Sequence, residues 1–222
     1  FLALDFNSLD RAMEVTDLTK DYLAGIKIGL ELYSVIGLEG IKKFETFNLP
    51  IFLDTKIFDI SNQVSKTINV IKKNKSIKYF TIHALGSSEM LIAAQNSAKG
   101  SDLEFLAVSI LTSWNEKDLK KIGITNSIKD QVKILIKLAH EAKLSGIIAS
   151  AQDIGLAREI SKDIKIFCPG IREDGKTQDQ KRTLSYKEFN DVADDKCFAV
   201  IGRPIYEGNP LENIKKIINT AE

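Results

Sequence analysis

The sequence predicts an α/β protein with the architecture of a single (β/α)8 TIM barrel. Eight short apolar runs rich in β-branched residues recur along the 222 residues, and segments with helical periodicity separate them. Each run is nearly continuous rather than alternating, as in strands that are buried on both faces of a parallel sheet. Eight such units fit a closed barrel better than a doubly wound sheet. No linker or low-complexity tract interrupts them, so we expect one domain over residues 1–222.

The predicted strands are the apolar runs themselves. They cover Phe1–Asp5, Ala24–Gly29, Ile51–Lys56, Tyr79–His83, Phe105–Leu111, Gly146–Ser150, Ile164–Cys168 and Phe198–Gly202. The predicted helices between them carry apolar residues at the spacing of one helical face. They cover Ser8–Tyr22, Val35–Phe47, Ser61–Asn74, Ser88–Ala98, Ile128–Lys143, Ala151–Lys162 and Pro210–Ala221, with a shorter candidate at Ser185–Val192.

Charge and hydropathy exclude two classes of protein. The 31 Lys and Arg residues against 30 Asp and Glu give a net charge of +1, whereas proteins that bind nucleic acid through its phosphates show a clear basic excess. No apolar run approaches the ~20 residues that cross a bilayer as a helix. We therefore expect no nucleic-acid and no membrane partner. The first residues do not resemble a secretory signal, and we expect a cytoplasmic protein.

Cysteine and histidine are too scarce to predict a zinc site. Cys168 and Cys197 lie far apart and match no metal or redox spacing, so we interpret both as small buried hydrophobic residues. His140 is expected to be an ordinary helix residue. His83 ends a strand, where a catalytic role and a packing or interface role are equally open. Trp114 either packs over a loop or borders the pocket.

Polar residues gather at the carboxyl ends of the predicted strands, which is where barrels of this kind hold their active sites. They are Asp5, Lys27, Asp54, Lys56, Thr81, His83, Thr112, Ser113, the run Pro169–Arg172, and Gly202 with Arg203. Because such residues are rare inside apolar strands, their position supports both the fold and a site at this end.

The densest of these signals is a row of alternating charge. Asp54 and Lys56 are two residues apart on a strand, so their side chains share a face. Lys27 on the neighbouring strand reaches the same layer, and Asp59 lies in the following loop. Charges inside a barrel are costly unless paired. One interpretation is a salt-bridge network that only plugs the barrel mouth.

The other interpretation of the charge row is catalytic. A lysine between carboxylates stays protonated and can protonate a developing carbanion as a general acid. Asp54 beside it would repel a substrate carboxylate until carbon dioxide leaves, which contributes by destabilising the ground state.

Two loops have the composition of a phosphate site. Gly202 permits close backbone approach, and the Arg203 guanidinium can bind a phosphate bidentately. Arg172 begins the polar stretch REDGKTQDQKR, which we interpret as a mobile lid. Phosphate sites in these barrels often lie in the loops after strands seven and eight. A plain surface role for Arg203 is the alternative.

Taken together, these motifs resemble the orotidine 5'-phosphate decarboxylase family. They occur in order over essentially the whole chain: ALDF, KIG, FLDTKIFDI, LTS, PGIR, DQKR and VIGR. The D-x-K-x-x-D pattern within FLDTKIFDI is only moderately specific alone, whereas the full ordered set is highly specific. The resemblance implies decarboxylation of orotidine 5'-monophosphate to uridine 5'-monophosphate in pyrimidine biosynthesis, with no cofactor and no metal.

The resemblance also implies roles for individual residues. Lys56 matches the proton donor to C6 of the pyrimidine, Asp54 the aspartate that faces the substrate carboxylate, and Lys27 its neighbour. The remaining matches are Asp5 and Lys27 for the ribose hydroxyls, Ser113 for the pyrimidine edge, Thr112 beside the ribose, Pro169 lining the pocket, Arg172 at the base of the closing loop, and Gln180, Gly202 and Arg203 for the phosphate.

In the family the second aspartate of the motif crosses into a partner's site. We therefore expect a homodimer in which Asp59 and Ile60 are contributed across the interface. Gln63 departs from the family pattern, because relatives have a threonine there that touches the ribose. The stretch REDGKTQDQ is also about one residue shorter than in many relatives, which bears on the assignment of Gln180.

Two alternatives use the same barrel. Sugar-phosphate decarboxylases and aldolases that share D-x-K-x-x-D hold Mg²⁺ and carry an acidic residue at the strand-two position. Lys27 occupies that position here, and its ammonium would repel the metal. A non-catalytic barrel that binds a nucleotide would be marked by loss of a charge-row member, and all four are present.

Overall fold

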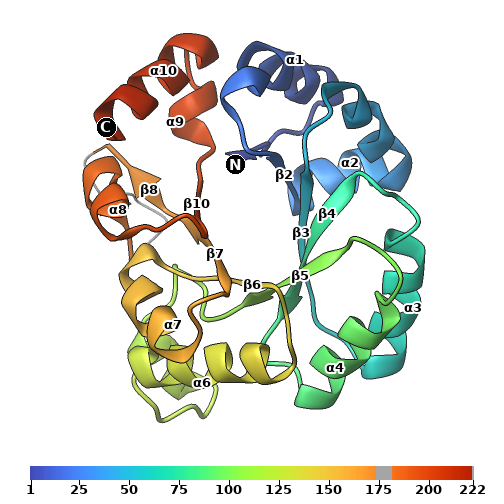
Figure 1. Cartoon of the computed structure of the whole chain (residues 1–222), viewed down its shortest axis with the longest axis vertical. Coiled ribbons are helices and arrows are strands. Elements are labelled where there is room, and N and C mark those ends of the chain that lie inside the picture. Colours follow the sequence, from blue (N-terminus) through green and yellow to red (C-terminus); the bar gives the residue numbers. More distant parts are fainter. Residues whose placement is uncertain (174–181, 222) are drawn as a thin grey trace.

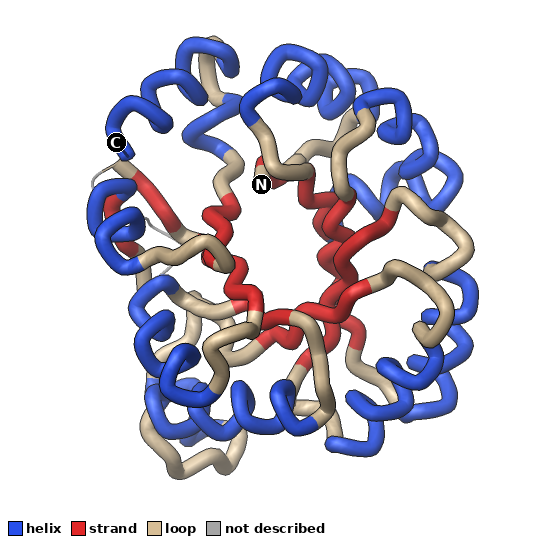
Figure 2. The backbone as a smooth tube through the Cα atoms, viewed as in Figure 1, coloured by secondary structure: helices blue, strands red, loops and turns tan. Residues whose placement is uncertain are grey.

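The computed structural model describes residues 1–173 and 182–221 and confirms the predicted barrel (Figure 1). Eight parallel strands pair in the order β1-β2-β3-β4-β5-β6-β7-β10. A parallel bridge between Leu2 and Ile201 joins the first strand to the last, and Ala3 N donates to Ile201 O at 2.8 Å. Figure 2 shows the strands as an inner ring surrounded by helices.

The strands of the barrel are short. They are β1 Leu2–Ala3, β2 Ile26–Gly29, β3 Ile51–Ile57, β4 Ile77–His83, β5 Glu104–Val108, β6 Gly146–Ile148, β7 Lys165–Pro169 and β10 Cys197–Val200. Two further strands, β8 Ile171–Arg172 and β9 Leu184–Ser185, pair with each other outside the barrel. All eight predicted strands are confirmed, with shifted ends. The fifth prediction, Phe105–Leu111, is wrong at its carboxyl end because the strand leaves the sheet after Val108.

The helices cover the outside of the strand ring (Figure 1). They are α1 Leu9–Thr19, α2 Leu30–Ile41, α3 Ser61–Ile71, α4 Ser88–Ser97, α5 Glu116–Lys121, α6 Ile128–Glu141, α7 Ile154–Ile160, α8 Tyr186–Val192, α9 Arg203–Tyr206 and α10 Pro210–Ala221. Short 3₁₀ turns, η1 Lys20–Tyr22, η2 Lys42–Phe47 and η3 Ala151–Asp153, adjoin α1, α2 and α7.

Several helix predictions are wrong in detail. The helix expected over Val35–Phe47 begins five residues earlier, kinks at Gly37 with φ 56° and ψ −168°, and ends as a 3₁₀ turn. Helices α5 and α9 are not predicted by the sequence. Helix α5 has only 6 residues, too few to show an apolar period, and a capping box between Asn115 and Asp118 begins it.

The core has two layers. The inner one lies inside the strand ring and consists of Ala3, Phe52, Tyr79, Leu106, Phe167 and Val200. The ring of Phe1 packs edge-on against four of the aromatic rings around it, with centroids 5.0–6.3 Å apart. The outer layer lies between strands and helices. Full burial of one Phe side chain stabilises the fold by roughly 1.5–3 kcal/mol. The inner layer and the Phe1 ring therefore stabilise the barrel and close its amino end with apolar side chains.

Charged residues at the amino ends of the strands bind one another. Glu104 accepts a hydrogen bond from Lys165 at 2.6 Å and forms an ion pair with Lys78 at 2.9 Å. Burial opposes ionisation of Glu104, but these two lysines hold the pKa of its carboxyl below its usual range. In barrels of this fold, residues at the amino-terminal face usually stabilise the fold and take no part in the chemistry.

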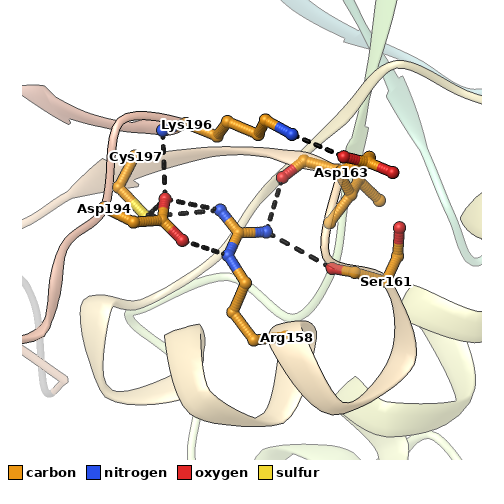
Figure 3. Close-up of polar contacts among 7 residues, drawn as sticks. Arg158, Ser161, Asp163, Asp194, Lys196 and Cys197 are labelled. Carbon is orange, nitrogen blue, oxygen red and sulfur yellow. Dashed lines mark hydrogen bonds and ion pairs between the residues drawn. The ribbon is translucent and has the colours of Figure 1, made fainter.

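A second cluster at the same end ties the loop before β7 to the loop before β10 (Figure 3). The Arg158 guanidinium binds both carboxylate oxygens of Asp194 and donates to Ile164 O at 2.7 Å. The hydrogen bond from Arg158 holds the pKa of Asp194 well below its usual range. Cys197 Sγ lies 3.2 Å from Asp194 Oδ1.

The two cysteines therefore differ. Cys168 is fully buried, as predicted, and burial raises the pKa of its thiol. The interpretation of Cys197 as a buried hydrophobic residue is wrong, because its partly exposed thiol belongs to the Arg158 cluster. Among the described residues, no helix has the length and apolar character needed to cross a membrane.

Candidate active site

A cavity of about 330 Å³ opens at the carboxyl ends of the barrel strands. Ten of the residues predicted for the site line it: Asp5, Lys27, Asp54, Lys56, Thr112, Ser113, Pro169, Arg172, Gly202 and Arg203. Apolar side chains, among them Phe52, Val108 and Val200, form its floor towards the barrel core. The predicted clustering of polar residues at this end of the barrel is thus confirmed.

Two other predicted residues, Asp59 and Ile60, are not part of this lining. Asp59 and Ile60 are exposed in the loop after β3, and Asp59 Oδ1 accepts a hydrogen bond from Ile60 N at 2.7 Å. Within one chain the charge row therefore ends at Lys56, and Asp59 is not among its ion pairs. Gln180 lies outside the described residues. Gln63 is exposed on α3.

The charge row itself is a chain of ion pairs. Lys27 Nζ lies 3.1 Å from Asp5 Oδ1 and 3.7 Å from Asp54 Oδ2, and Lys56 Nζ lies 2.9 Å from Asp54 Oδ1. The side chains of Lys27 and Asp54 are only 12% and 13% exposed, whereas that of Lys56 is 33% exposed. The inner pair is thus shielded from water, and the Lys56 ammonium remains open to a molecule in the cavity.

The way in which Asp54 and Lys56 meet differs from the prediction. The prediction rests on the two-residue period of a regular strand, but β3 is irregular there. Leu53 pairs with Phe80 and Ile57 with Ile82, so three residues of β3 face one residue of β4. Lys56 has a φ of 51°, in the left-handed region. A residue other than glycine held there costs about 1–3 kcal/mol, and such residues cluster at functional sites.

Thr81 is the single β4 residue that faces this bulge, and the sequence analysis gave it no role. Its hydroxyl accepts a hydrogen bond from Lys56 N at 2.7 Å and donates one to Asp54 Oδ1 at 3.1 Å. Its side chain is fully buried. The only signal in the sequence is a hydroxyl residue inside the apolar run YFTIH.

Two glycines, Gly29 and Gly202, leave room for the site, and the role of Gly29 is not predicted by the sequence. A Cβ atom at Gly29 would stand 2.9 Å from Lys27 Nζ and 3.3 Å from Asp5 Oδ1. A Cβ atom at Gly202 would stand 3.3 Å from Ala3 and from the Tyr206 ring. The backbone after β10 can therefore lie close against β1, which brings Arg203 to the rim of the cavity.

Tyr206 supports the wall of the cavity near Asp5. Its ring packs on that of Phe6 with centroids 4.5 Å apart. Burial raises the pKa of Tyr206 to about 12, and the negative charge of Asp5 adds to the shift. The phenol therefore stays neutral around pH 7 and serves as packing beside the carboxylate.

His83 lies close to the charge row without lining the cavity. Burial lowers the pKa of its imidazole, and the positive charge of Lys56 lowers it further. Its Nδ1 accepts a hydrogen bond from Leu85 N at 3.3 Å, and its ring lies 5.8 Å from that of Phe58. The geometry favours the packing interpretation of His83 over the catalytic one.

A buried ion pair supports the loop that carries Thr112 and Ser113. Arg182 donates to Asp153 Oδ2 at 2.7 Å and to Ile110 O at 2.9 Å. Their side chains are 12% and 10% exposed. Burial raises the pKa of the Asp153 carboxyl, while the Arg182 charge opposes that shift. The pair thus joins the chain after β6 to the chain after β5.

The arrangement of the carboxylates in the cavity indicates whether they suit a metal ion. The Lys27 ammonium lies between the carboxylates of Asp5 and Asp54, where a cation would otherwise bind. Over residues 1–173 and 182–221, no cluster of three or more His, Cys, Asp or Glu side chains is arranged to hold an ion. These carboxylates therefore fit an ammonium partner better than Mg²⁺.

A charged cavity at the carboxyl ends of the strands of a (β/α)8 barrel is where enzymes of this fold carry out their chemistry. The fold thus places the chain in the class of barrel enzymes, with paired lysines and aspartates lining this cavity. The chain matches the family described as "Orotidine 5'-phosphate decarboxylase / HUMPS family" over residues 1–217, and it belongs to that family.

Individual relatives agree with this membership. The chain is 38% identical over 219 residues to orotidine 5'-phosphate decarboxylase of Ehrlichia chaffeensis, covering 97% of this chain and 94% of that protein. It is 37% identical over 221 residues to the protein of that name from Wolbachia pipientis subsp. Culex pipiens, covering 98% and 96%. The crystal structure of orotidine 5'-phosphate decarboxylase from Lactobacillus acidophilus is similar with a TM-score of 0.83 and 26% identity, covering 100% of this chain and 97% of that one.

Proposed function

We propose that this chain decarboxylates orotidine 5'-monophosphate to uridine 5'-monophosphate, as the last step of pyrimidine nucleotide synthesis. The observation that carries the proposal is the placement of Lys56 Nζ 2.9 Å from Asp54 in the cavity of a chain of this family. A decarboxylation through a carbanion breaks a carbon–carboxylate bond. A fixed carboxylate can repel the leaving carboxylate, and a fixed cation beside it can stabilise the carbanion that forms.

The proposed chemistry uses Lys56 as the proton donor. Loss of carbon dioxide leaves an electron pair at C6 in the plane of the pyrimidine ring, where it cannot delocalise into the π system. The Lys56 ammonium stabilises that pair and then transfers a proton to C6, so the C6–carboxyl bond breaks and a C6–H bond forms. Asp54 repels the substrate carboxylate before the bond breaks, and Lys27 holds Asp54 in place through the 3.7 Å ion pair.

The rest of the cavity binds the nucleotide in this proposal. Arg203, the Gly202 backbone and Gln180 bind the phosphate. Arg172 lies at the base of the predicted closing loop that contains Gln180. Asp5 and Lys27 bind the ribose hydroxyls, Thr112 lies beside the ribose, Ser113 binds the pyrimidine edge, and Pro169 lines the pocket. Barrier reductions towards the ~23 kcal/mol end of the enzymatic range require such remote binding energy, because one lysine cannot supply them alone.

A homodimer completes the site in this proposal. Asp59 and Ile60 would enter the partner's cavity, and Asp59 would extend the charge row there. Two exposed apolar side chains flank Asp59, since Phe58 is 63% and Ile60 68% exposed. Large apolar side chains that are exposed close together in the sequence, as here, occur at interfaces, which supports this arrangement.

Mixing two inactive variants tests the shared site. Asp59→Ala and Lys56→Ala proteins are each expected to be nearly inactive. Mixed and re-equilibrated, they form hybrid dimers in which one of the two sites has both residues, so activity should return. No recovery, with exchange of subunits shown by mass, argues against a shared site.

Product analysis tests the proposed reaction. Purified protein is given orotidine 5'-monophosphate, and uridine 5'-monophosphate and carbon dioxide are measured over time. The expected result is equal molar amounts of both products. Binding of the nucleotide without either product would instead support a non-catalytic barrel.

A further inference from the structure

We infer that Thr81 is a positioning residue that sets the Lys56 ammonium against Asp54 through its buried hydroxyl. The inference rests on the proposed function, in which these two groups act on the substrate. Thr81 does not line the cavity, so it acts through the residues that do.

The bulge in β3 creates the need for such a residue. Between the pairs Leu53–Phe80 and Ile57–Ile82, the three residues from Asp54 to Lys56 face Thr81 alone. Two residues of β3 are thus in excess, and the backbone turns into the left-handed region at Lys56. A lysine has no intrinsic preference for this conformation, so contacts around it must hold it there. Bulges of this kind re-aim side chains next to active sites.

The Thr81 hydroxyl makes two of those contacts at once. It accepts from Lys56 N at 2.7 Å and donates its one proton to Asp54 Oδ1 at 3.1 Å. The same Asp54 Oδ1 accepts a hydrogen bond from Lys56 Nζ at 2.9 Å. One buried oxygen therefore fixes the backbone of the proposed proton donor and the carboxylate that its side chain binds.

The hydroxyl also completes the set of groups around Asp54. Lys27 from β2 faces Oδ2, while Lys56 from β3 and Thr81 from β4 face Oδ1. Three neighbouring strands thus hold one carboxylate, and only the contact from Thr81 carries no charge. A catalytic constellation has to be held within a fraction of an ångström, and supporting hydrogen bonds supply that precision.

Two substitutions and a control test the inference. Thr81→Val keeps the shape and removes both hydrogen bonds, whereas Thr81→Ser keeps the hydroxyl. Thr16→Val is the matched control, because Thr16 is also fully buried, its hydroxyl donates to Ala12 O at 2.7 Å, and neither residue lines the cavity. We expect Thr81→Val to lower kcat by about 100-fold, since misplacement by ~1 Å has effects of that size.

The pattern across variants separates positioning from stability. Thr81→Ser is expected to keep kcat within about threefold of wild type, and Thr16→Val to lose stability without losing kcat. The Kd of uridine 5'-monophosphate should change by less than about threefold in all of them. Wild-type kcat in Thr81→Val, an equal loss in Thr81→Ser, or a parallel loss of product affinity would overturn the inference. Thr81→Ala carries the same expectation where Thr81→Val does not fold.

Crystal structures test the geometry apart from the reaction. In Thr81→Val, we expect Lys56 to leave the left-handed region or its ammonium to move ~1 Å or more from Asp54. An unchanged Lys56 in Thr81→Val would overturn the inference even if that variant loses activity. If wild type fails to turn over the substrate, the proposed function falls, while this structural comparison still decides the role of Thr81.

Discussion

Lys56 Nζ lies 2.9 Å from Asp54 Oδ1, while the lysine backbone stands in the left-handed region with a φ of 51°. A regular strand would also place residues 54 and 56 on one face. The bulge differs from a regular strand because it sets both residues opposite Thr81, whose hydroxyl binds them both. The ion pair is therefore held from the backbone as well as from the side chains.

Replacing the proposed proton donor should abolish chemistry and spare binding. We expect Lys56→Ala to lower kcat by about 10³–10⁴-fold or more, since it removes both the acid and the fixed charge. The Kd of uridine 5'-monophosphate, measured by calorimetry, should stay within about tenfold. Lys137→Ala, at an exposed lysine of α6, is the control and should retain full activity. Near-normal kcat in Lys56→Ala would refute the assignment of the donor.

Removing the proposed phosphate ligand should act mainly on affinity. Arg203 lies at the rim of the cavity, next to the backbone of Gly202. We expect Arg203→Ala to raise KM by about 100-fold, with a smaller loss of kcat because remote binding energy is used in the transition state. Steady-state kinetics measures both. Arg11→Ala, at an exposed arginine of α1 that pairs with Glu14, serves as the control. A KM like that of wild type in Arg203→Ala would show that the phosphate binds elsewhere.

A methyl group at Gly29 should disturb Lys27 without unfolding the protein. The φ of Gly29 is −89°, which alanine adopts readily, but its Cβ would stand 2.9 Å from Lys27 Nζ. We expect Gly29→Ala to lower kcat/KM by about 10- to 100-fold through displacement of that ammonium. Gly155→Ala on α7 is matched, because nothing lies within 4 Å of its added Cβ. Equal activity of the two variants in the same assay would show that the room at Gly29 is irrelevant.

The buried pair of Arg182 and Asp153 should matter for stability. Asp153→Ala leaves the Arg182 guanidinium buried without its carboxylate, and we expect a loss of about 3–5 kcal/mol in the free energy of unfolding. Glu159→Ala breaks an exposed pair with Lys133 and should cost ~0–1 kcal/mol. Urea denaturation measures both. Losses of similar size would mean that burial of the Arg182 pair contributes nothing.

Because of His83, the free energy of unfolding should fall in mildly acidic solution. Burial, followed by the Lys56 charge, lowers the pKa of its imidazole below the ordinary 6.5. The unfolded chain therefore takes up this proton more readily than the folded one. The contribution of His83 is full above pH 6.5 and is lost as the pH falls through the folded-state pKa. Unfolding at about pH 7.5 and pH 5 should show a smaller drop for His83→Gln than for wild type. An equal drop would assign the acid sensitivity to other groups.

Much of the fold was predictable because local and global signals agree. The apolar runs locate every strand of the barrel, and strand ends locate the polar residues, because a parallel barrel gathers all carboxyl ends on one face. Helix ends were less predictable. Helix α2 starts directly after β2, and its kink lies at Gly37, where φ is 56°; an apolar period marks neither feature.

The support of the site was less predictable than its charged members. Lys27, Asp54 and Lys56 stand out because charge is rare in apolar strands. Thr81 and Gly29 do not, since their roles depend on the register between β3 and β4 and on the path of the Lys27 side chain. Strand register is set by tertiary packing and not by one strand's sequence. Whether Asp59 reaches a second chain stays a prediction, because it depends on how two chains pack and not on the sequence around Asp59.

The most direct test of the central claim is the decarboxylation of orotidine 5'-monophosphate in the presence of excess chelator, followed by near-UV absorbance. Wild-type protein is compared with Lys56→Ala, and each is shown to be folded by circular dichroism. We predict loss of the substrate signal with wild type alone, at a rate that the chelator does not change. Folded wild-type protein that leaves the substrate intact, or that acts only once Mg²⁺ is restored, would contradict the account.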